Sequence, residues 1–396
     1  MKTNLAVFFG GRSVEHEVSI ISAVQAMKAL DTEKYNIIPV YITKDAEMYT
    51  GPMLFFIENY RNMQYLLSAS NPVSIVRSGA NVVMKYLKSG FLSRRKDVII
   101  DVALPIVHGT NCEDGAIAGF FELLGLPYVG CDILSAAVGM DKAIYKDVLK
   151  NAGLPVLDCY KFTSREYSLD RNGVVEKIIS EFSLPVIIKP VNLGSSVGIT
   201  KADTKEELID AIELAVKFSE LVLAERAVQN LREINCSVMG DRDECEASVL
   251  EEPIMHDKIL SYKDKYEGNE KSKGMASLSR KIPAELDENT TDKIRKLSCD
   301  IFKALGCNGV VRIDYLMDSK TGEVYANEIN TVPGSLSFYL WDATGIKYPE
   351  LLDKLIDLAF KRQRSRENLT FTIPTNILSG VSFGSKGAKG AKGSKF

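Results

Sequence analysis

The sequence predicts a protein of mixed α/β and α+β class, with a parallel α/β domain at the N-terminus and antiparallel strands in the C-terminal third. Two patterns lead to this prediction. A strand, a Gly turn, a helix and a second strand follow one another within residues 5–42, which is typical of a parallel α/β domain. Residues 310–317 and 324–330 are two β-prone runs separated by the polar turn Ser319–Gly322, which indicates a hairpin.

Composition is that of an ordinary globular protein with two or three domains. The chain has 396 residues, of which 45% are hydrophobic and 26% charged, and its net charge is −3. This charge gives no overall basic field for nucleic acid, and no apolar run is long enough to cross a membrane. Seven dispersed cysteines without a CxxC pair favour reduced thiols in the cytoplasm over a disulfide framework or a zinc site.

The N-terminal elements are a strand at Leu5–Phe9, a helix at Glu15–Leu30 and a strand at Tyr35–Ile42. Ligands are expected at the carboxyl end of the first strand, where Gly10 and Gly11 make a tight turn. A lone Gly pair does not indicate a dinucleotide site, because no G-x-G-x-x-G motif follows. Glu15 in the first helical turn has two interpretations of similar weight, a functional carboxylate or favourable placement at the helix N-terminus.

The next region is less regular. Residues 51–95 remain ambiguous, since the first part could be a helix and the second part resembles surface. Val98–Val107 is predicted to be one apolar strand that ends at His108, and Glu113–Leu124 a helix. A further helix carries Lys142 and runs towards Asn151, where Ala-Gly gives a C-cap signal.

Lys189 lies near the end of a predicted strand at Leu184–Pro190, and a Gly/Ser loop, residues 192–198, follows it. Such a loop can fold its N–H groups over phosphate oxygens. It differs from the G-x-x-x-x-G-K-[ST] phosphate loop because the lysine precedes it, and ordinary hairpin chemistry is the alternative. A helix at Lys205–Glu220 and strands at Leu221–Glu225 and Ile234–Met239 come next.

Two later segments lack periodicity. Residues 255–279 are long, polar and rich in lysine and tyrosine, which favours a lid that docks on a charged ligand. The tail from Gly384 repeats Gly and Lys without proline and is predicted to be a disordered basic extension. Helices are expected at Asp292–Leu305 and at Tyr348–Arg362.

The C-terminal hairpin carries the strongest candidate site. If Asp318 pairs with Val324, then Asp314 lies opposite Glu328 and Arg312 opposite Asn330, all on one face. A shift by one residue would separate the two sets, so this register is an assumption. Two facing carboxylates need a counter-ion, and Mg²⁺ prefers such oxygen ligands. A solvated face of the hairpin is the alternative interpretation.

Seven motifs in this order resemble the D-alanine–D-alanine ligase family of ATP-grasp enzymes over residues 4–360. The motifs are GGRSVEHEVS, HGTNCEDGAIAG, VGMDK, IIKPVNLGSSVG, KDKY, RIDY and NEINTVPG. The resemblance implies an N-terminal α/β domain (1–135), a central ATP-grasp lobe (136–225), a C-terminal ATP-grasp lobe with a lid (226–370) and an extension with the tail (371–396).

The resemblance also implies residue roles. Phosphate contacts fall to Lys142, Lys189 and Ser196, and adenine or ribose contacts to Glu225, Arg226, Val228 and Glu233. Asp314, Glu328 and Asn330 match ligands of Mg²⁺, with Mn²⁺ as an alternative. Glu15 and His108 would hold the first amino acid, and Arg312 and the Gly334 N–H would stabilise an oxyanion. Lid closure would use Ser195, Lys265 and Tyr266.

The implied reaction joins two D-amino acids through an acyl phosphate, in a cytoplasmic homodimer that contributes to peptidoglycan synthesis. The chain departs from the family pattern where a Ser-Leu pair binds the second substrate, because Tyr339 and Leu340 occupy those positions. The family's adenine-side lysine is Arg226 here. Acceptors such as D-serine or D-lactate, another dipeptide or amide product, and a non-catalytic ATP-binding protein therefore stay open as alternatives.

Overall fold

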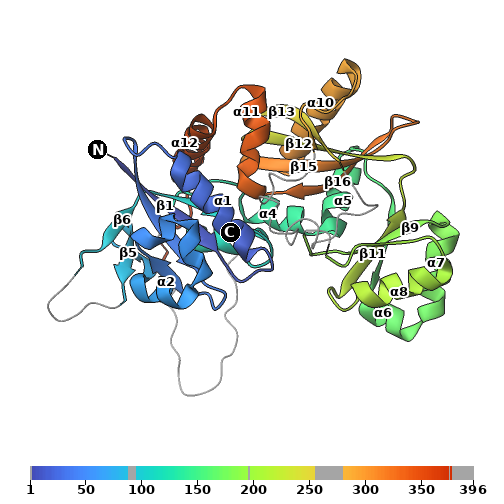
Figure 1. Cartoon of the computed structure of the whole chain (residues 1–396), viewed down its shortest axis with the longest axis horizontal. Coiled ribbons are helices and arrows are strands. Elements are labelled where there is room, and N and C mark those ends of the chain that lie inside the picture. The colour runs from blue at the N-terminus through green and yellow to red at the C-terminus, as the bar shows by residue number, and fades with distance from the viewer. Residues whose placement is uncertain (1, 88–94, 195–196, 255–279, 374, 377–396) are drawn as a thin grey trace.

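A computed structural model describes residues 2–87, 95–194, 197–254, 280–373 and 375–376 of the chain. Three β-sheets follow one another along the sequence, and each forms the centre of one lobe (Figure 1). The N-terminal lobe and the central lobe lie at opposite ends of the molecule, and the C-terminal sheet lies between and above them in this view (Figure 1).

The N-terminal sheet has seven strands in the order β6-β5-β4-β3-β2-β1-β7. These strands are β1 (Thr3–Gly10), β2 (Tyr35–Ile42), β3 (Met48–Thr50), β4 (Asn71–Ser78), β5 (Asn81–Tyr86), β6 (Val98–Ile100) and β7 (Val102–Ile106). The predicted parallel arrangement is present in β2-β1-β7, whereas β3 to β6 extend the sheet with antiparallel pairings.

Both faces of the parallel strands are covered, as their continuous apolar sequences require. Leu5, Val7 and Phe9 of β1 pack with α1 (His16–Ala29) and with the C-terminal helix, while Ala6 and Phe8 pack towards α3 (Ala116–Leu124). The alternation follows from the two-residue period of a strand.

Two expectations for this lobe were wrong in detail. The helix considered after Gly51 is three short pieces, η1 (Pro52–Phe55), η2 (Ile57–Arg61) and α2 (Met63–Ala69), and the β4-β5 hairpin follows them. The single strand expected at 98–107 is interrupted at Asp101, whose side chain accepts a hydrogen bond from the Asn4 N–H at 2.7 Å. Its two halves, β6 and β7, become the two edge strands of the sheet.

The helix expected around Met140–Asn151 is also two helices, α4 (Ile133–Met140) and α5 (Lys142–Asn151). Asp141 ends the first and caps the second, accepting hydrogen bonds from the N–H groups of Ala143 and Ile144, both at 2.9 Å. Capping by aspartate is favoured because it satisfies N–H groups that have no partner within the helix. The break places Lys142 at the first position of α5.

The central lobe is a four-stranded antiparallel sheet with helices on one face. Its strands, in the order β10-β9-β11-β8, are β8 (Cys159–Thr163), β9 (Val186–Pro190), β10 (Thr200–Ala202) and β11 (Leu221–Arg226). Its helices are α6 (Ser164–Leu169), α7 (Arg171–Phe182) and α8 (Lys205–Ala215). Apolar residues of α7 and α8 pack on Val186, Ile188, Val222 and Ala224. Residues between these positions, such as Lys189 and Glu225, therefore belong to the opposite face.

The C-terminal sheet is antiparallel in the order β14-β13-β12-β15-β16. Its strands are β12 (Leu231–Gly240), β13 (Cys245–Pro253), β14 (Arg280–Lys281), β15 (Gly309–Asp318) and β16 (Val324–Asn330). One face packs on α10 (Glu288–Ala304) and α5 through Ile234, Val311, Ile313 and Tyr315. The other face carries the intervening residues, including Asn235, Arg312 and Asp314.

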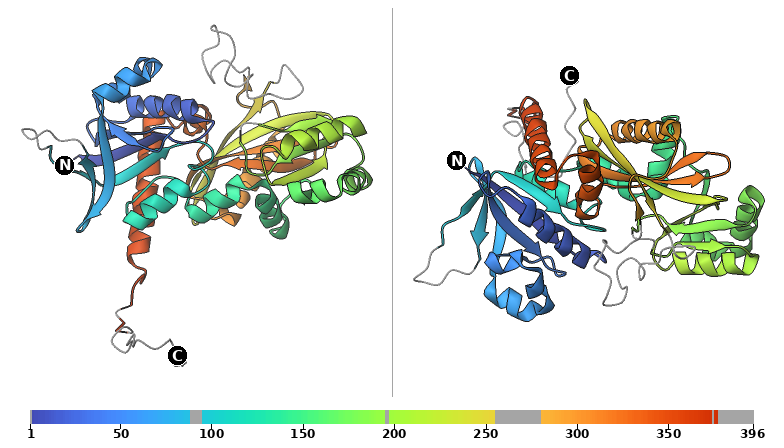
Figure 2. Two further views of the ribbon diagram at one scale, coloured as in Figure 1. Left: turned by 90° about the horizontal axis from the view of Figure 1, so that it is seen from below. Right: turned by 45° about the horizontal axis from the view of Figure 1, so that its top comes forward.

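The chain returns to the N-terminal lobe through η4 (Gly334–Ser337), α11 (Phe338–Thr344) and α12 (Tyr348–Glu367). Figure 2 shows α12 lying alongside that lobe, and Leu351, Leu352 and Leu355 join its core. Arg362 donates hydrogen bonds to the carbonyl oxygens of Gly130 (2.6 Å) and Tyr128 (2.5 Å). The first and last parts of the chain thus share one core.

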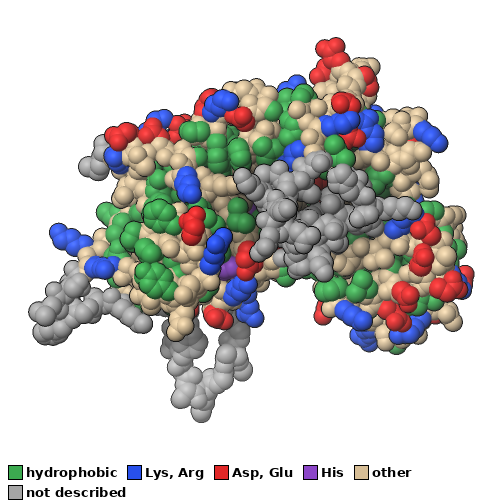
Figure 3. Space-filling model, in the orientation of Figure 1, with side chains coloured by type: hydrophobic (Ala, Val, Ile, Leu, Met, Phe, Trp, Pro, Cys, Tyr) green, Lys and Arg blue, Asp and Glu red, His purple; other side chains and the backbone are tan. Residues whose placement is uncertain are grey.

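Acidic and basic side chains are interspersed over the visible surface (Figure 3), in keeping with a net charge of −3. Within the described ranges, every helix is too short or too polar to cross a membrane. The predicted lid (255–279) and the Gly/Lys tail lie outside the described residues.

Candidate active site

A cavity of about 410 Å³ lies between the face of the central sheet opposite α7 and α8 and the face of the C-terminal sheet opposite α10. Strands β9 and β11 supply one wall, and β12, β15 and β16 supply the other. The lining includes seven residues that the sequence singled out: Lys189, Glu225, Arg226, Val228, Glu233, Asp314 and Glu328. Apolar side chains of Ile187, Ile199, Leu231 and Leu316 complete it. Apolar walls with a few convergent charges are typical of a small-molecule site.

Charged groups are concentrated around Glu225, which is fully buried. Its carboxylate forms ion pairs with Lys189 and with Lys146, the latter at 2.8 Å. Lys189 Nζ also donates a hydrogen bond to Asn327 Oδ1 at 2.8 Å, which links the central sheet to β16. Burial alone would raise the pKa of Glu225, but the two ammonium groups outweigh it and lower the pKa to about 2. The cluster carries a net positive charge.

Because the pKa of Glu225 is lower in the folded chain than the usual value of about 4.5, its ionisation stabilises the fold. This contribution is present above about pH 4.5 and is lost as the pH falls through the folded value. We expect the unfolding free energy of the wild type, relative to Glu225→Gln, to drop by about 1 kcal/mol between pH 5 and pH 3.5. Urea titrations of both proteins at the two pH values measure it, and a constant difference would count against the ion pairs.

The hairpin brings together the residues that the sequence placed on one face. Arg312 pairs with Asn330, and Asp314 with Glu328, as predicted. The assumed partner of Val324 was wrong, since Met317 and not Asp318 lies opposite it. A β-bulge at Asn327 compensates this offset of one residue, so that Asp314 still lies opposite Glu328. A bulge re-aims side chains next to it, and here Asn327 as well as Glu328 lines the cavity.

Asp314 is held from two sides. Arg312 donates two hydrogen bonds to its carboxylate, from Nε at 2.6 Å and from Nη2 at 2.7 Å. Asn330 Nδ2 donates a third at 3.1 Å. Glu328 Oε2 lies 3.1 Å from Lys142 Nζ, which also donates to the carbonyl oxygen of Leu193 at 2.7 Å. The facing carboxylates of Asp314 and Glu328 are thus each compensated by a cation of the chain.

Within the described part of the chain, no group of three or more His, Cys, Asp and Glu side chains could hold a metal by itself. The candidate set is two carboxylates and one amide, with Asp314, Glu328 and Asn330 as its members. Such a set suits Mg²⁺, which keeps water and phosphate oxygens in its remaining positions, and it does not suit a structural zinc ion.

Glu15 lies at the border between the N-terminal lobe and the Gly/Ser loop of the central lobe. It occupies the N-cap position of α1, where its side chain makes no capping hydrogen bond, so any stabilisation of the helix would come from its charge alone. A Cβ placed on Gly109 would lie 3.4 Å from Glu15 Oε2, and one placed on Gly194 would lie 3.5 Å from Oε1. Both glycines leave room for the carboxylate between the two lobes.

His108 is buried beside Glu15. Its Nδ1 is 2.8 Å from the Val332 carbonyl oxygen, and its Nε2 is 3.2 Å from Ser22 Oγ. Burial lowers the pKa of His108, and Arg312 lowers it further, although Glu15 and the contact with Val332 act in the opposite direction. The imidazole is therefore neutral at neutral pH and can donate one hydrogen bond and accept another.

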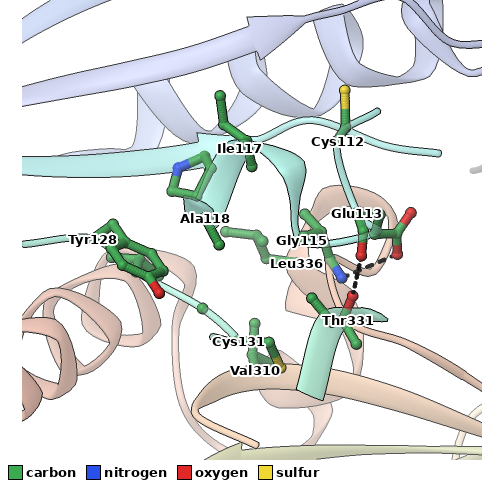
Figure 4. Close-up of a pocket in the computed structure, with 15 residues that line it drawn as sticks. Cys112, Glu113, Gly115, Ile117, Ala118, Tyr128, Cys131, Val310, Thr331 and Leu336 are labelled. Atoms are coloured by element: carbon green, nitrogen blue, oxygen red, sulfur yellow. Dashed lines mark hydrogen bonds between the residues drawn. The ribbon is translucent and has the colours of Figure 1, made fainter. Parts of the chain in front are cut away.

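Glu113 connects the N-terminal lobe to the segment that follows β16. It was not among the residues predicted from the sequence. It accepts hydrogen bonds from the N–H groups of Gly109 (2.9 Å) and Val332 (3.1 Å), and its carbonyl oxygen accepts one from Thr331 Oγ1. Figure 4 shows it beside a cavity of about 30 Å³, enough for about one water molecule. Burial, reinforced by Glu15, raises the pKa of Glu113 to about 8.

The chain leaves β16 through Pro333 and Gly334 into a turn in which Ser335, Leu336 and Ser337 all have positive φ, at 50°, 54° and 51°. Each such non-Gly residue costs about 1–2 kcal/mol, so the surroundings must hold the turn. Ser335 does so by donating from its N–H to Ser22 Oγ (3.0 Å) and from its hydroxyl to Gln25 Oε1 (2.6 Å).

The positive-φ turn feeds into α11, where Tyr339 and Leu340 lie. The Tyr339 hydroxyl donates to Glu251 Oε2 at 3.0 Å. Leu340 is fully buried, backbone included, and therefore belongs to the core that supports the turn.

Among the predicted residues, Arg226 lies at the cavity edge, where its Nη2 donates to the Tyr325 hydroxyl at 2.8 Å. Ser195, Ser196, Lys265 and Tyr266 lie outside the described residues. The residues that sequence reasoning missed are Lys146, Glu113, Asn327 and Glu251. A signal existed for Lys146, which is four residues after Lys142 and thus on the same helix face. Asn327 had none, because a bulge is not visible in the strand pattern.

Comparison with known proteins adds independent evidence. A family model described as the D-ala D-ala ligase N-terminus matches residues 4–131, and one described as the D-ala D-ala ligase C-terminus matches residues 148–357. A curated protein from Acetivibrio thermocellus, named D-alanine--D-alanine ligase, is 41% identical over 384 residues, covering 93% of this chain and 98% of that protein.

Solved structures agree with these matches. The D-alanine-D-alanine ligase from Coxiella burnetii has a TM-score of 0.78 at 30% identity and covers 92% of this chain and 96% of its own. The VanG D-Ala:D-Ser ligase from Enterococcus faecalis has a TM-score of 0.75 at 33% identity, with 91% and 100% covered. A Bacillus anthracis D-alanine--D-alanine ligase complexed with ATP has a TM-score of 0.64 at 25% identity, with 92% and 99% covered.

Proposed function

Because this chain belongs to the D-alanine–D-alanine ligase family, we propose that it is an ATP-dependent ligase that joins two D-alanine molecules for peptidoglycan synthesis. The observation that carries the proposal is the cavity between two antiparallel sheets, where Lys189 lines one wall and the carboxylates of Asp314 and Glu328 line the other. In such a reaction the carboxylate of the first amino acid attacks the γ-phosphorus of ATP, which gives an acyl phosphate and ADP. The amine of the second then attacks the acyl carbon, and phosphate leaves.

The cavity suits ATP in the charges that it offers. Lys142 and Lys189, on neighbouring elements, would bind the phosphates, because compact ammonium groups suit phosphate oxygens. Both are 5% exposed and are held in place by Glu328 and Glu225. Contacts with the adenine and the ribose would come from four residues that line the cavity, Glu225, Arg226, Val228 and Glu233. Ser196, Lys265 and the lid residues Ser195 and Tyr266 remain part of this proposal through the family resemblance alone.

The donor set of Asp314, Glu328 and Asn330 fits Mg²⁺, and Mn²⁺ as its substitute, because all three offer oxygen atoms on one face of the hairpin. A magnesium ion bound there would neutralise phosphate charge during phosphoryl transfer. The present ion pairs of Asp314 with Arg312 and of Glu328 with Lys142 would then loosen or be shared with the phosphates.

We expect Glu328→Gln to raise the Mg²⁺ concentration that gives half-maximal activity by about 10- to 150-fold, because one charged ligand is lost, worth about 1.5–3 kcal/mol. A Mg²⁺ titration at saturating ATP measures it. The matched control is Glu323→Gln in the turn of the same hairpin, which is exposed and should titrate like the wild type. Identical curves for Glu328→Gln and the wild type would remove Glu328 from the set.

Other residues of the chain would act on the amino acids. Glu15, between the lobes, would pair with the ammonium group of the first amino acid, with the neutral His108 beside it. Arg312 and the Gly334 N–H would stabilise the oxyanion of the second step, and such preorganised donors are worth about 3–4 kcal/mol each. Closing the site over the acyl phosphate would exclude water that could hydrolyse it.

A second candidate function is the synthesis of a product with another acceptor. The similarity to a D-Ala:D-Ser ligase and the Tyr339–Leu340 pair support it. The decisive experiment measures ADP release with ATP, Mg²⁺ and each of D-alanine, D-serine and D-lactate, with the products identified by mass. Formation of D-alanyl-D-alanine supports the main proposal. ATP binding without ADP release from any of these substrates would instead favour a non-catalytic protein.

The cytoplasmic location and the homodimer also belong to this proposal. All seven cysteines are free, which suits a reducing compartment. Light scattering during size-exclusion chromatography tests the homodimer.

A further inference from the structure

A row of polar side chains crosses the C-terminal sheet and extends beyond the candidate metal ligands. Glu328 pairs with Asp314, Asp314 with Asn235, and Asn235 with Glu251, so the row runs over β16, β15, β12 and β13. Residues paired across neighbouring strands point to the same face of the sheet. Glu328 and Asp314 are proposed metal ligands. Glu251, at the other end of the row, is neither a proposed metal ligand nor a lining residue of the cavity.

Glu251 is a buried carboxylate, only 3% exposed, and three side chains surround it. Asn235 Nδ2 donates to Oε2 at 3.2 Å, the Tyr339 hydroxyl donates to the same oxygen at 3.0 Å, and Arg280 Nη1 lies 3.0 Å from Oε1. Burial of a carboxylate is costly unless such partners are present, so the arrangement is built rather than incidental.

Arg280 and Tyr339 also contact each other. The Arg280 guanidinium lies over the Tyr339 ring, 4.5 Å from its centroid. Burial and the neighbouring Glu251 raise the pKa of Tyr339 to about 12, so its hydroxyl stays protonated and donates. The ring below and the carboxylate beside it therefore fix the position of the guanidinium.

The Glu251–Arg280–Tyr339 cluster is next to the proposed reaction centre. Asn235 joins the two, because it pairs with Asp314 of β15 and its Nδ2 donates to Glu251 Oε2 of the cluster at 3.2 Å. The cluster lies on β13, β14 and α11, whereas Glu15 and His108, assigned to the first amino acid, come from the N-terminal lobe. An amino acid bound at the cluster would therefore be held by elements other than those that carry Glu15 and His108.

We propose that Arg280, positioned by Glu251 and Tyr339, binds the carboxylate of the acceptor amino acid. The inference rests on the proposed ligase function. A guanidinium has five N–H donors in a planar fork, so it can hold Glu251 and a second carboxylate at the same time. Tyr339 then acts on the acceptor through Arg280, since its own hydroxyl already donates to Glu251. The site consequently takes an acceptor that carries a carboxylate.

The test measures initial rates against D-alanine concentration and resolves the KM of the donor site from that of the acceptor site. We expect Arg280→Gln to raise the acceptor KM by about 10- to 100-fold, as for a lost charged hydrogen bond, while the ATP and donor KM values change less than about 2-fold. Arg280→Lys should recover part of the loss. Glu251→Gln and Tyr339→Phe should raise the acceptor KM by smaller factors, because Arg280 remains but is less well fixed.

Glu252→Gln is the matched control. Glu252 is the next residue on β13, and it forms a similar pair with Arg232, in which two hydrogen bonds of 2.7 Å join the side chains. Successive strand residues point to opposite faces, so this pair lies away from the Glu251–Arg280–Tyr339 cluster. We expect its acceptor KM to match that of the wild type.

Equal increases in donor and acceptor KM for Arg280→Gln, or no change in a folded protein, would overturn the assignment. Thermal melting shows whether each variant is folded. If Arg280→Gln does not fold, Arg280→Lys is the deciding variant, because the proposal requires its acceptor KM to rise while its donor KM stays unchanged. Absence of ADP release from the wild type with D-alanine would instead refute the proposed function, so the two failures are distinguishable.

Discussion

Replacing Lys189 by alanine is expected to lower kcat/KM for ATP by about 10²- to 10³-fold, the largest effect that we predict for the ATP site. Lys189 is 5% exposed and pairs with the fully buried Glu225. Loss of one preorganised cation at a transferring phosphoryl group costs about 10²- to 10³-fold in rate. Removal of one partner of a buried ion pair separately costs about 3–5 kcal/mol of folding stability. In addition, the phosphates of ATP would lose one of the two cations proposed to hold them.

The loss has two components that must be separated. Without Lys189, Glu225 keeps only Lys146, and Asn327 Oδ1 loses its donor, so the folded protein itself is destabilised. Thermal melting with and without ATP measures both components. We expect a lower melting temperature for Lys189→Ala in the absence of ATP, and a smaller rise on ATP addition than in the wild type.

Lys161→Ala is the control for this variant. Lys161 and Lys189 both pair with Leu223 of β11, one from β8 and the other from β9, so the two lysines start on the same face of the central sheet. Lys161 instead pairs with the largely exposed Asp147 at 2.5 Å, and exposed pairs contribute only about 0–1 kcal/mol. Unchanged ATP kinetics in Lys189→Ala together with normal folding would show that the phosphate assignment is incorrect.

The elements with strong periodicity could be predicted from the sequence. β2 has the predicted bounds, and α1 and α3 begin within a few residues of the predicted position. These elements are specified by local patterns, such as the turn after Phe9 and Gly125 after α3. The class of the fold and the face of the hairpin that carries Arg312 and Asp314 follow from the same local information.

Features that depend on contacts distant in sequence could not be predicted. The bulge at Asn327 serves an interaction with Lys189, which is 138 residues away, and nothing near Asn327 in the sequence signals it. The break at Asp141 was not predicted, because helix-forming residues continue on both sides of it. Glu251 and Arg280 are adjacent only because β13 and β14 pair, across a long segment without periodicity.

The prediction for Arg312 concerns the second half of the reaction. We expect Arg312→Ala to lower kcat by about 10²- to 10³-fold, the loss that follows removal of a preorganised oxyanion donor. Arg312→Lys should also be slow, because lysine keeps the charge but lacks the planar fork that donates twice to Asp314. Steady-state kinetics with saturating ATP and D-alanine measures both variants.

Arg312 touches a proposed metal ligand, so an effect on Asp314 must be distinguished from an effect on the oxyanion. If Arg312 only orients Asp314, its loss should raise the Mg²⁺ requirement, and excess Mg²⁺ should restore the rate. If it stabilises the oxyanion, the Mg²⁺ dependence should stay close to that of the wild type while kcat remains low. Hydroxylamine, which traps an acyl phosphate as a hydroxamate, should then still yield product from Arg312→Ala, because only the second step is impaired.

Arg295→Ala provides the control on the same lobe. Arg295 is an exposed residue of α10, on the other face of the C-terminal sheet, and donates to the Ala247 carbonyl oxygen at 2.9 Å. Arg295→Ala removes a guanidinium from the same lobe but leaves the face that carries Arg312 and Asp314 unchanged, so kcat should be preserved. If excess Mg²⁺ restores the wild-type rate of Arg312→Ala, Arg312 only supports Asp314. The oxyanion would then be stabilised by the Gly334 N–H alone.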